Sequence, residues 1–199
     1  NEGIILGNMG IISGNLGKND QAIKYFEKAL KYSQKADDKF NQAVWLGNLG
    51  SFYSNTGDEK KAIKYTIEAI KISEEIGDKY NHSIWLSNLG LSLSNLGDQK
   101  QAMDITEESL KISKEIEDWI NIGICTGNIG IFYGKLGEEK TALEYYQEAL
   151  KIASELEDKK SESRWLGYLG LAFSNLGKQN QAIEFLEKAI DISEKLNDI

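Results

Sequence analysis

The stretch Trp45–Gly50, with the sequence WLGNLG, returns along this chain at a spacing close to forty residues. Its counterparts are Leu6–Gly10, Trp85–Gly90, Thr126–Gly130 and Trp165–Gly170. Five copies at one fixed spacing indicate a repeat array, in which each repeat must stack on its neighbours to bury a continuous core. The sequence therefore predicts a single array over residues 1–199 and not a set of independent compact domains.

A second recurring glycine divides each repeat into two segments, which we call helix A and helix B. These glycines are Gly17, Gly57, Gly97, Gly137 and Gly177. A glycine directly after a periodic segment is the usual left-handed stop of a helix. Helix B starts at once, and Asp58, Asp98 and Glu138 place negative charge at its positive end. Each repeat is therefore predicted to be a helix-turn-helix unit.

Helix B carries apolar and small residues on one face with the 3.6-residue period of an α-helix. In the first repeat these are Ala22, Phe26, Ala29 and Leu30, while Glu27 and several lysines occupy the opposite face. An alanine recurs at the first of these positions in every repeat, which indicates that two helices approach closely there. These alanines are Ala62, Ala102, Ala142 and Ala182. Aspartates that follow helix B are expected to cap the next helix A. They are Asp38, Asp78, Asp118 and Asp158.

The composition excludes several functional classes. A net charge of −8 argues against nucleic acid and against an anionic membrane as partners, and no apolar run approaches the ~20 residues of a membrane span. Cys125 is the only cysteine, so no intramolecular disulfide can form and a reducing cytoplasm is expected. His82 is the only histidine, so neither a metal site nor a catalytic triad can be assembled around it. We therefore expect a cytoplasmic protein that is not an enzyme and needs no cofactor or metal.

Together, these recurring residues resemble the pattern of the tetratricopeptide repeat family. The resemblance rests on Leu49–Gly50, Tyr53, Gly57, Ala62 and Ala69 with their equivalents in the other repeats. The usual unit has 34 residues, and the longer unit here is similar to the forty-residue arrays of kinesin light chains and of modulators of G-protein signalling. The resemblance implies an all-α, right-handed superhelical solenoid of five helix-turn-helix repeats. They span approximately residues 1–38, 39–78, 79–118, 119–158 and 159–199.

In tetratricopeptide arrays the A helices line a concave groove and the B helices form the outer wall. The A helices of this chain are almost free of charge. The range Asn41–Thr56 holds no charged residue. The five equivalent ranges, one in each repeat, together hold only Glu2, Lys135, Glu162 and Arg164. The resemblance thus implies a neutral groove that binds a protein or an extended peptide.

Asparagines recur at two positions of helix A that the family would turn toward this groove. The first column is Asn8, Asn48, Asn88 and Asn128, with Tyr168 in the fifth repeat. The second column includes Asn55, Asn95 and Lys135. A row of side-chain amides, each with one acceptor and two donors, can hold the peptide groups of an extended chain. The alternative is a ladder in which each asparagine bonds the neighbouring helix A. Arg164 begins the same stripe, and it forms either a polar anchor with Tyr168 or a surface contact on an aromatic ring.

Three further features of helix A call for an interpretation. Small residues recur inside the helix, and because glycine there costs ~1 kcal/mol against alanine we expect the close approach of another backbone. This column is Gly7, Gly47, Ser87, Gly127 and Gly167. A second column, interpreted as core, is Ile5, Trp45, Trp85, Cys125 and Trp165. Trp119 replaces the lysine that opens three of the other A helices, and it is the best candidate for an exposed aromatic contact.

The sequence begins inside a helix, because Asn1 aligns with Asn41, and no polar capping helix follows the fifth helix B. We interpret the chain as a piece of a longer protein whose apolar ends allow end-to-end self-association. The function expected is a binding scaffold for a protein or peptide. The alternatives are a structural spacer or self-assembly module, and a sensor array that regulates an attached effector domain.

Overall fold

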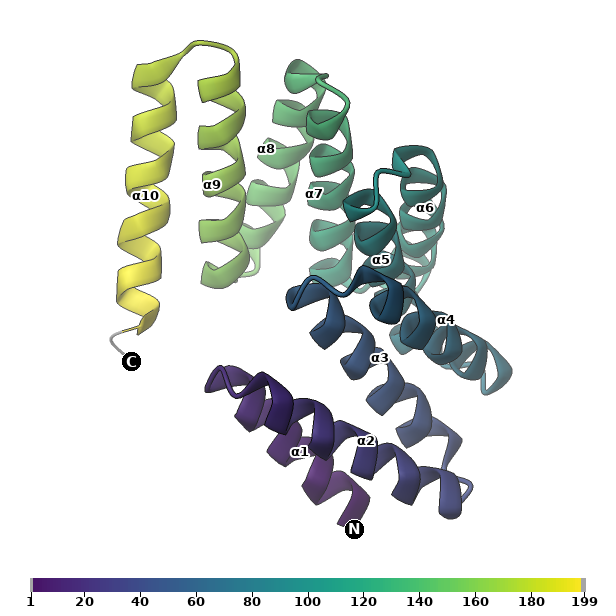
Figure 1. Ribbon diagram of the computed structural model, residues 1–199. Coiled ribbons are helices and arrows are strands. Elements are labelled where there is room, and N and C mark those ends of the chain that lie inside the picture. Colours follow the sequence, from purple (N-terminus) through teal and green to yellow (C-terminus); the bar gives the residue numbers. More distant parts are fainter. Residues whose placement is uncertain (1, 198–199) are drawn as a thin grey trace. The chain divides into compact units, whose positions relative to one another are not determined.

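The computed structural model describes residues 2–197, and within them it consists of ten α-helices and no strand (Figure 1). Helix A of the successive repeats is α1 (Glu2–Asn15), α3 (Lys39–Asn55), α5 (Lys79–Asn95), α7 (Trp119–Lys135) and α9 (Lys159–Asn175). Helix B is α2 (Asn19–Lys35), α4 (Glu59–Glu75), α6 (Gln99–Glu115), α8 (Glu139–Glu155) and α10 (Gln179–Asn197). The all-α repeat solenoid predicted from the sequence is confirmed. Asn1, which was aligned with Asn41, lies outside the described residues.

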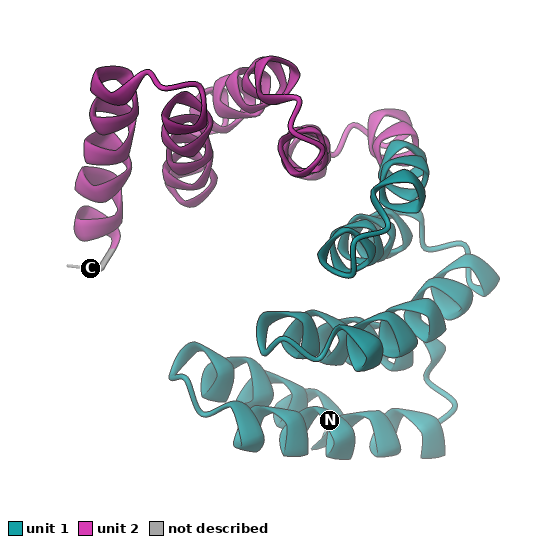
Figure 2. Cartoon of the chain, turned by 45° about the horizontal axis from the view of Figure 1, so that its top comes forward, with its two compact units in different colours: residues 1–109 teal, residues 110–199 magenta. Residues whose placement is uncertain are grey.

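The chain divides into two compact units, residues 1–109 and residues 110–199 (Figure 2). In unit 1, helices α1 to α5 pack in chain order, and the A helices α1, α3 and α5 also contact one another in succession. In unit 2, helices α7 to α10 pack in chain order, and α7 also contacts α9. Within each unit, a B helix that lies between two A helices contacts both of them. One side of each A-helix layer is therefore covered, and the other side is left open.

The two turns of the repeat reverse the chain by different means. Helix A ends at the predicted left-handed glycines, whose φ values lie between 71° and 95°. The first four B helices each end at a left-handed residue. After α4 this residue is Gly77, while after α2, α6 and α8 it is Asp37, Glu117 and Glu157, with φ values of 50° to 56°. Left-handed residues other than glycine are uncommon, so the sequence pattern did not predict this second turn.

The predicted aspartate caps are present. Oδ1 of Asp38 accepts a hydrogen bond from the backbone nitrogen of Asn41 at 3.0 Å, and Oδ2 accepts a second one from the side chain of Asn41 at 2.7 Å. The same backbone cap recurs at Asp78, Asp118 and Asp158. Each cap satisfies a free N–H group in the first turn of helix A and so fixes where that helix begins.

The tryptophan column belongs to the core, as predicted. Trp45, Trp85 and Trp165 are 4%, 5% and 0% exposed, and Cys125 at the same position of its repeat is 0% exposed. Ile5 differs, since it is 57% exposed.

The prediction that the small-residue column admits another backbone is wrong, because the element that comes close is a side chain. A Cβ atom added at Gly7 would overlap the indole of Trp45, which belongs to the next repeat. The same relation joins Gly47 to Trp85 and Gly127 to Trp165. At Gly167, by contrast, an added Cβ would meet no described heavy atom within 4 Å. At these three glycines the indole of the next repeat thus occupies the space that a side chain would otherwise fill.

No helix within residues 2–197 combines the length and the apolar character that crossing a membrane requires.

Candidate functional site

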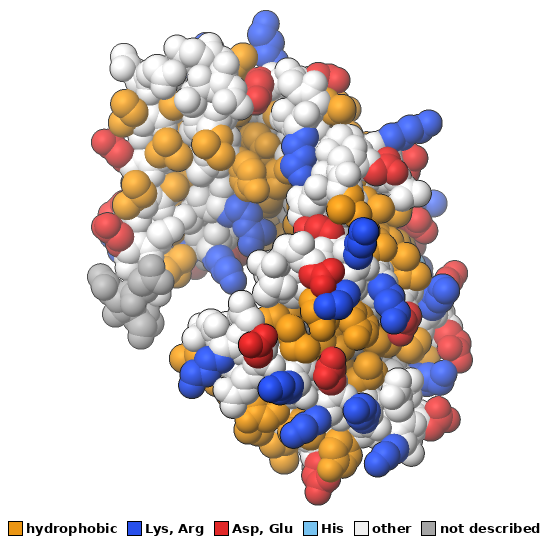
Figure 3. All heavy atoms as spheres, in the orientation of Figure 1, with side chains coloured by type: hydrophobic (Ala, Val, Ile, Leu, Met, Phe, Trp, Pro, Cys, Tyr) orange, Lys and Arg blue, Asp and Glu red, His pale blue; other side chains and the backbone are white. Residues whose placement is uncertain are grey.

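We call the open side of the A-helix layer the A face. On α3 it comprises Val44, Asn48 and Ser51, which are half-buried, and Asn55, which is exposed. Their spacing of four, three and four residues places them in one stripe along the helix. This stripe is neutral, because α3 holds no charged residue after Lys39. On the B helix α2, by contrast, lysine and acidic side chains lie interspersed (Figure 3).

Asn88 is engaged in the ladder that was the alternative to ligand binding. Its Nδ2 donates to Oγ of Ser51 on the preceding A helix at 3.0 Å, and that hydroxyl donates in turn to the carbonyl of Gly47 at 3.1 Å. One turn further along, Oγ of Ser92 donates to Oγ of Ser54 at 3.3 Å. The A helices α3 and α5 are therefore joined by side-chain bonds across the A face.

Asn48 has a different environment, although it occupies the same column as Asn88. Among residues 2–197 its amide has no hydrogen-bond partner. The residue that corresponds to Ser51 on the preceding A helix is Ile11, which offers no hydroxyl group. Asn8, one repeat earlier, is exposed. The first column therefore supplies a free amide at Asn48 and a bonded one at Asn88.

The second asparagine column also contains bonded side chains. Nδ2 of Asn95 donates to Oε1 of Glu59 at 2.7 Å, and Nδ2 of Asn175 donates to Oε1 of Glu139 at 2.6 Å. Each glutamate lies 36 residues earlier, in the first turn of helix B of the preceding repeat. The corresponding positions for Asn55 and Lys135 hold Asn19 and Gln99, which are not carboxylates. Asn55 and Lys135 are both exposed.

A small hollow of about 60 Å³ opens between α3 and α5 on the A face of unit 1. Its lining consists of Gly50, Ser51, Ser54, Asn55, Thr66, Asn88, Leu91 and Ser92. Thr66 lies at the base of the hollow, where a Cβ added at Gly50 would overlap its hydroxyl. Phe26 and Tyr146 occupy the equivalent position in the first and fourth repeats. The short threonine side chain thus leaves space that a large ring fills elsewhere.

In unit 2 one candidate residue, Asn128, is buried, and two others, Tyr168 and Arg164, lie against aromatic rings. Asn128 is only 4% exposed. Tyr168 is half-buried and stacks on Tyr146, with ring centroids 5.3 Å apart, and burial raises the pKa of the Tyr146 hydroxyl. The guanidinium of Arg164 lies 5.6 Å from the centroid of the Trp165 ring. Arg164 thus lies near an aromatic ring.

The groups that could support chemistry have structural partners. Nδ1 of His82 lies 3.2 Å from Oγ of Ser73 and 3.3 Å from the carbonyl oxygen of Ile70, so the ring joins α5 to α4. Within residues 2–197 no three histidine, cysteine or acidic residues are grouped so that they could hold a metal ion.

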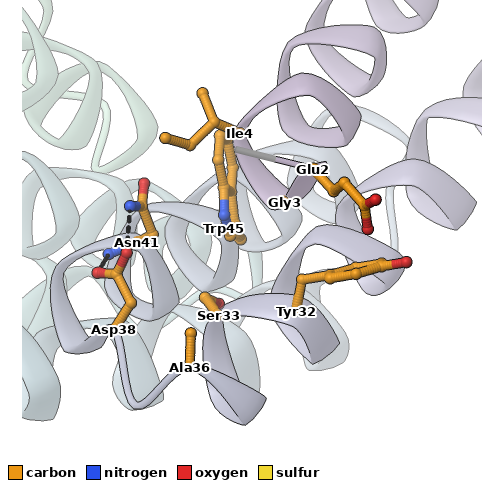
Figure 4. A pocket seen from close by; sticks show the side chains of 9 residues that line it. All are labelled: Glu2, Gly3, Ile4, Tyr32, Ser33, Ala36, Asp38, Asn41 and Trp45. Carbon is orange, nitrogen blue, oxygen red and sulfur yellow. Dashed lines mark hydrogen bonds between the residues drawn. The ribbon is translucent and has the colours of Figure 1, made fainter.

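A larger hollow of about 260 Å³ lies where the start of α1 meets the end of α2 and the start of α3 (Figure 4). Its lining consists of Glu2, Gly3, Ile4, Tyr32, Ser33, Ala36, Asp38, Asn41 and Trp45. Two of its polar side chains, Asp38 and Asn41, already bond each other. The nearby carboxylate of Glu2 raises the pKa of the Tyr32 hydroxyl. The hollow therefore offers few free polar groups to a ligand.

Comparisons with known proteins identify the repeat. Residues 1–75, 41–115 and 124–195 match the sequence model of a family described as Tetratricopeptide repeat. A search of the curated proteins found no match.

Several solved structures share the fold. The chain aligns with a Rap protein complexed with Competence and Sporulation Factor at a TM-score of 0.91 and 17% identity, covering 99% of this chain and 55% of that one. It aligns with BtubC (BKLC) from P. vanneervenii at a TM-score of 0.75 and 20% identity, covering 98% of this chain and 80% of that one. A third structure is the signal transduction ATPase PH0952 from Pyrococcus horikoshii, which has a tetratricopeptide repeat sensor. The chain aligns with it at a TM-score of 0.75 and 24% identity, covering 97% of this chain and 30% of that one. This chain thus spans about half the length of the Rap protein and less than a third of the ATPase.

Proposed function

This chain belongs to the tetratricopeptide repeat family, and from that premise we propose that it binds an extended segment of a partner protein along its A faces. The repeat is in general a protein-interaction scaffold. The observation that carries the more specific proposal is the amide of Asn48, which is half-buried on a neutral helix without a partner among residues 2–197. An amide in this state can both donate to and accept from a peptide group.

The surroundings of Asn48 support a peptide as the ligand. Asn55 lies two turns further along the same stripe and is exposed, so α3 presents two free amides in one line. The hollow above Thr66 opens beside that line and has room for a small side chain. Because α3 and α5 carry no charge on this face, the segment that fits best is uncharged over the residues in contact.

Two structural relatives are consistent with this proposal. One is a Rap protein that was crystallised in complex with Competence and Sporulation Factor. The other is an ATPase with a tetratricopeptide repeat sensor, which supports the alternative that this chain regulates an attached effector domain. In either case we propose that the five repeats of residues 1–199 act as one array in the cytoplasm, with a protein or peptide as the partner.

The test is a selection of peptides from a random library against the whole chain, followed by affinity measurements on variants. We expect Asn48→Ala and Asn55→Ala to weaken the selected peptides about five- to a hundredfold each, the effect of losing a buried hydrogen bond. The matched control is Lys71→Ala on the exposed outer surface of α4, which should leave the affinity unchanged. Peptides that respond to the outer variant and not to the A-face variants would contradict the proposal.

A second candidate function is self-assembly, and it rests on the two ends of the array. Ile5 and Ile12 on α1 are 57% and 58% exposed, while Ile183 and Ile190 on α10 are 54% and 56% exposed. Gly167 on α9 also leaves open the space that a tryptophan fills at Gly7, Gly47 and Gly127. End-to-end contact between copies would cover both surfaces in the way that successive repeats cover each other.

A further inference from the structure

The fourth repeat departs from the others at the first residue of its helix A. That residue is Trp119, which is 56% exposed, whereas the second, third and fifth repeats begin helix A with Lys39, Lys79 and Lys159. A tryptophan in a position otherwise given to lysine is unusual on a solvated surface, because a large exposed aromatic ring gains nothing from water. The ring thus presents an apolar surface that a partner can cover.

Trp119 borders a groove of about 460 Å³ between the start of α7 and the second half of α8. The apolar part of this groove is formed by the indole together with Ile122 and Ile152. Gly123 lets α7 approach α8 closely here, since a Cβ added to it would lie 3.0 Å from Cγ2 of Ile152. The groove belongs to unit 2 alone and lies away from the A-face residues.

The equivalent position in the second repeat indicates what kind of chemical group would lie over the indole of Trp119. There Nζ of Lys39 lies 3.7 Å from Oε2 of Glu75 at the end of α4. Two repeats later, the position of Lys39 is occupied by Trp119, whereas the position of Glu75 is again a glutamate, Glu155. The fourth repeat has thus kept the carboxylate and exchanged the chain's own cation for an aromatic surface.

The charges of the groove favour a cation from outside. Glu117, Glu148 and Glu155 line it against two lysines, Lys114 and Lys151. The Lys151–Glu155 pair is loose, with a separation of 3.9 Å and both side chains mostly exposed. No lysine or arginine among residues 2–197 lies over the Trp119 ring, although five other aromatic rings carry such a cation.

We propose that this groove binds the cationic side chain, an arginine or a lysine, of a basic segment in a partner protein. The cationic head lies over the indole of Trp119 and pairs with Glu155, in the place that the ammonium group of Lys39 takes in the second repeat. Arginine suits the site better than lysine, because its planar guanidinium stacks on an aromatic face and meets a carboxylate in a bidentate manner. This site is separate from the A face and does not depend on the function proposed for that face.

The probe is a terminally blocked five-residue peptide with one arginine among alanines, titrated into the whole chain while the indole N–H signals are followed by NMR. We expect a saturable shift at the Trp119 indole. Trp119→Lys should weaken binding about three- to thirtyfold, the range of a cation–π contact. This variant should fold normally, because lysine already occupies the position in three other repeats. Glu155→Gln removes the carboxylate without changing the indole and should weaken binding in the same direction.

Two controls make the result decisive. A peptide in which citrulline replaces arginine has the same shape without the charge, and it should not bind at this site. Lys39→Trp recreates the arrangement in the second repeat next to Glu75, so it should raise the number of bound peptides from one to two. Equal binding of the citrulline peptide, unchanged binding to Trp119→Lys, or the absence of a second site in Lys39→Trp would overturn the proposal.

Discussion

The indole of Trp45 occupies the space in which a side chain on Gly7 would lie. A glycine inside a helix costs ~1 kcal/mol relative to alanine, whereas losing a buried aromatic side chain costs on the order of 3–5 kcal/mol. The packing term is the larger one, and this explains the glycine at the three positions that face an indole, which are Gly7, Gly47 and Gly127. The packing term also outweighs the cost of burying the indole N–H of Trp45, which has no hydrogen-bond partner among the described residues.

The glycine–tryptophan contact predicts opposite effects for the same substitution at two sites. Gly47→Ala places a methyl group against the indole of Trp85, and overpacking of this kind costs about 1–3 kcal/mol. Gly167→Ala meets open space, so it should gain up to ~1 kcal/mol from helix propensity. Thermal melting followed by circular dichroism measures both. A stabilising Gly47→Ala would show that the indole shifts aside without cost.

The natural exception to this pattern predicts a compensating pair. Ser87 replaces glycine in the third repeat. The residue 38 positions later is Cys125, where the second, third and fifth repeats have Trp45, Trp85 and Trp165. We therefore expect Gly47→Ser to destabilise the chain alone, and Trp85→Cys to reduce the added cost of the serine when the two are combined. A double-mutant cycle on the midpoint of urea unfolding measures this coupling. Strictly additive effects would mean that the two columns do not depend on each other.

The two asparagines of the first column predict different stabilities after the same change. Asn88→Ala loses the bond to Ser51, worth ~1 kcal/mol, and recovers only part of it through helix propensity. Asn48→Ala has no such bond to lose, so it should be neutral or slightly stabilising. Urea unfolding should therefore place Asn88→Ala about 1 kcal/mol below Asn48→Ala. Equal stability of the two variants would mean that the bond contributes nothing in solution.

The cap of α3 predicts a stability difference that depends on pH. Hydrogen bonds from the side chain and the backbone of Asn41 hold the pKa of Asp38 below its ordinary value of 3.8. A carboxyl group with a lowered pKa stabilises the folded state above its unfolded pKa, and this contribution is lost as the pH falls through the folded pKa. Asp38→Ala should thus cost ~1 kcal/mol near pH 7 and less at about pH 3.

Asp38→Asn is the matched control, since asparagine caps a helix well but does not titrate. Its stability relative to the wild type should improve as the pH is lowered, because only the wild type loses its capping charge. Melting temperatures of the three proteins at both pH values measure the effect. A deficit of Asp38→Ala that stays constant with pH would contradict the assignment of this cap.

Most of the fold could be predicted from single positions, because each column repeats one physical requirement. The aspartate before Lys39 predicts a cap, the glycine at Gly57 predicts a left-handed stop, and the tryptophan at Trp45 predicts core, all from the local pattern. These features depend on the repeat itself and not on which repeat is the neighbour.

The site was harder to predict because it depends on pairs of columns. Asn48 and Asn88 are the same residue in the same column, yet the preceding helix offers Ile11 to one and Ser51 to the other. Likewise Asn95 donates to Glu59, which stands 36 residues earlier in the sequence. Each asparagine has to be compared with the residue that it faces on the preceding A helix, such as Ile11 or Ser51. A single column does not contain this information.

The open position at Gly167 leads to a prediction about self-association. If copies stack end to end as successive repeats do, residue 5 of one copy will meet Gly167 of another, where the array elsewhere places a tryptophan. Ile5 fills this space only in part, so Ile5→Trp should tighten association about tenfold through the larger apolar surface that it buries. Adding Gly167→Leu to Ile5→Trp should cancel this gain by filling the space from the other side. Light scattering over a range of protein concentrations measures the association. A chain that stays monomeric with Ile5→Trp, or one that associates equally well with Gly167→Leu, would show that the two ends do not meet in this register.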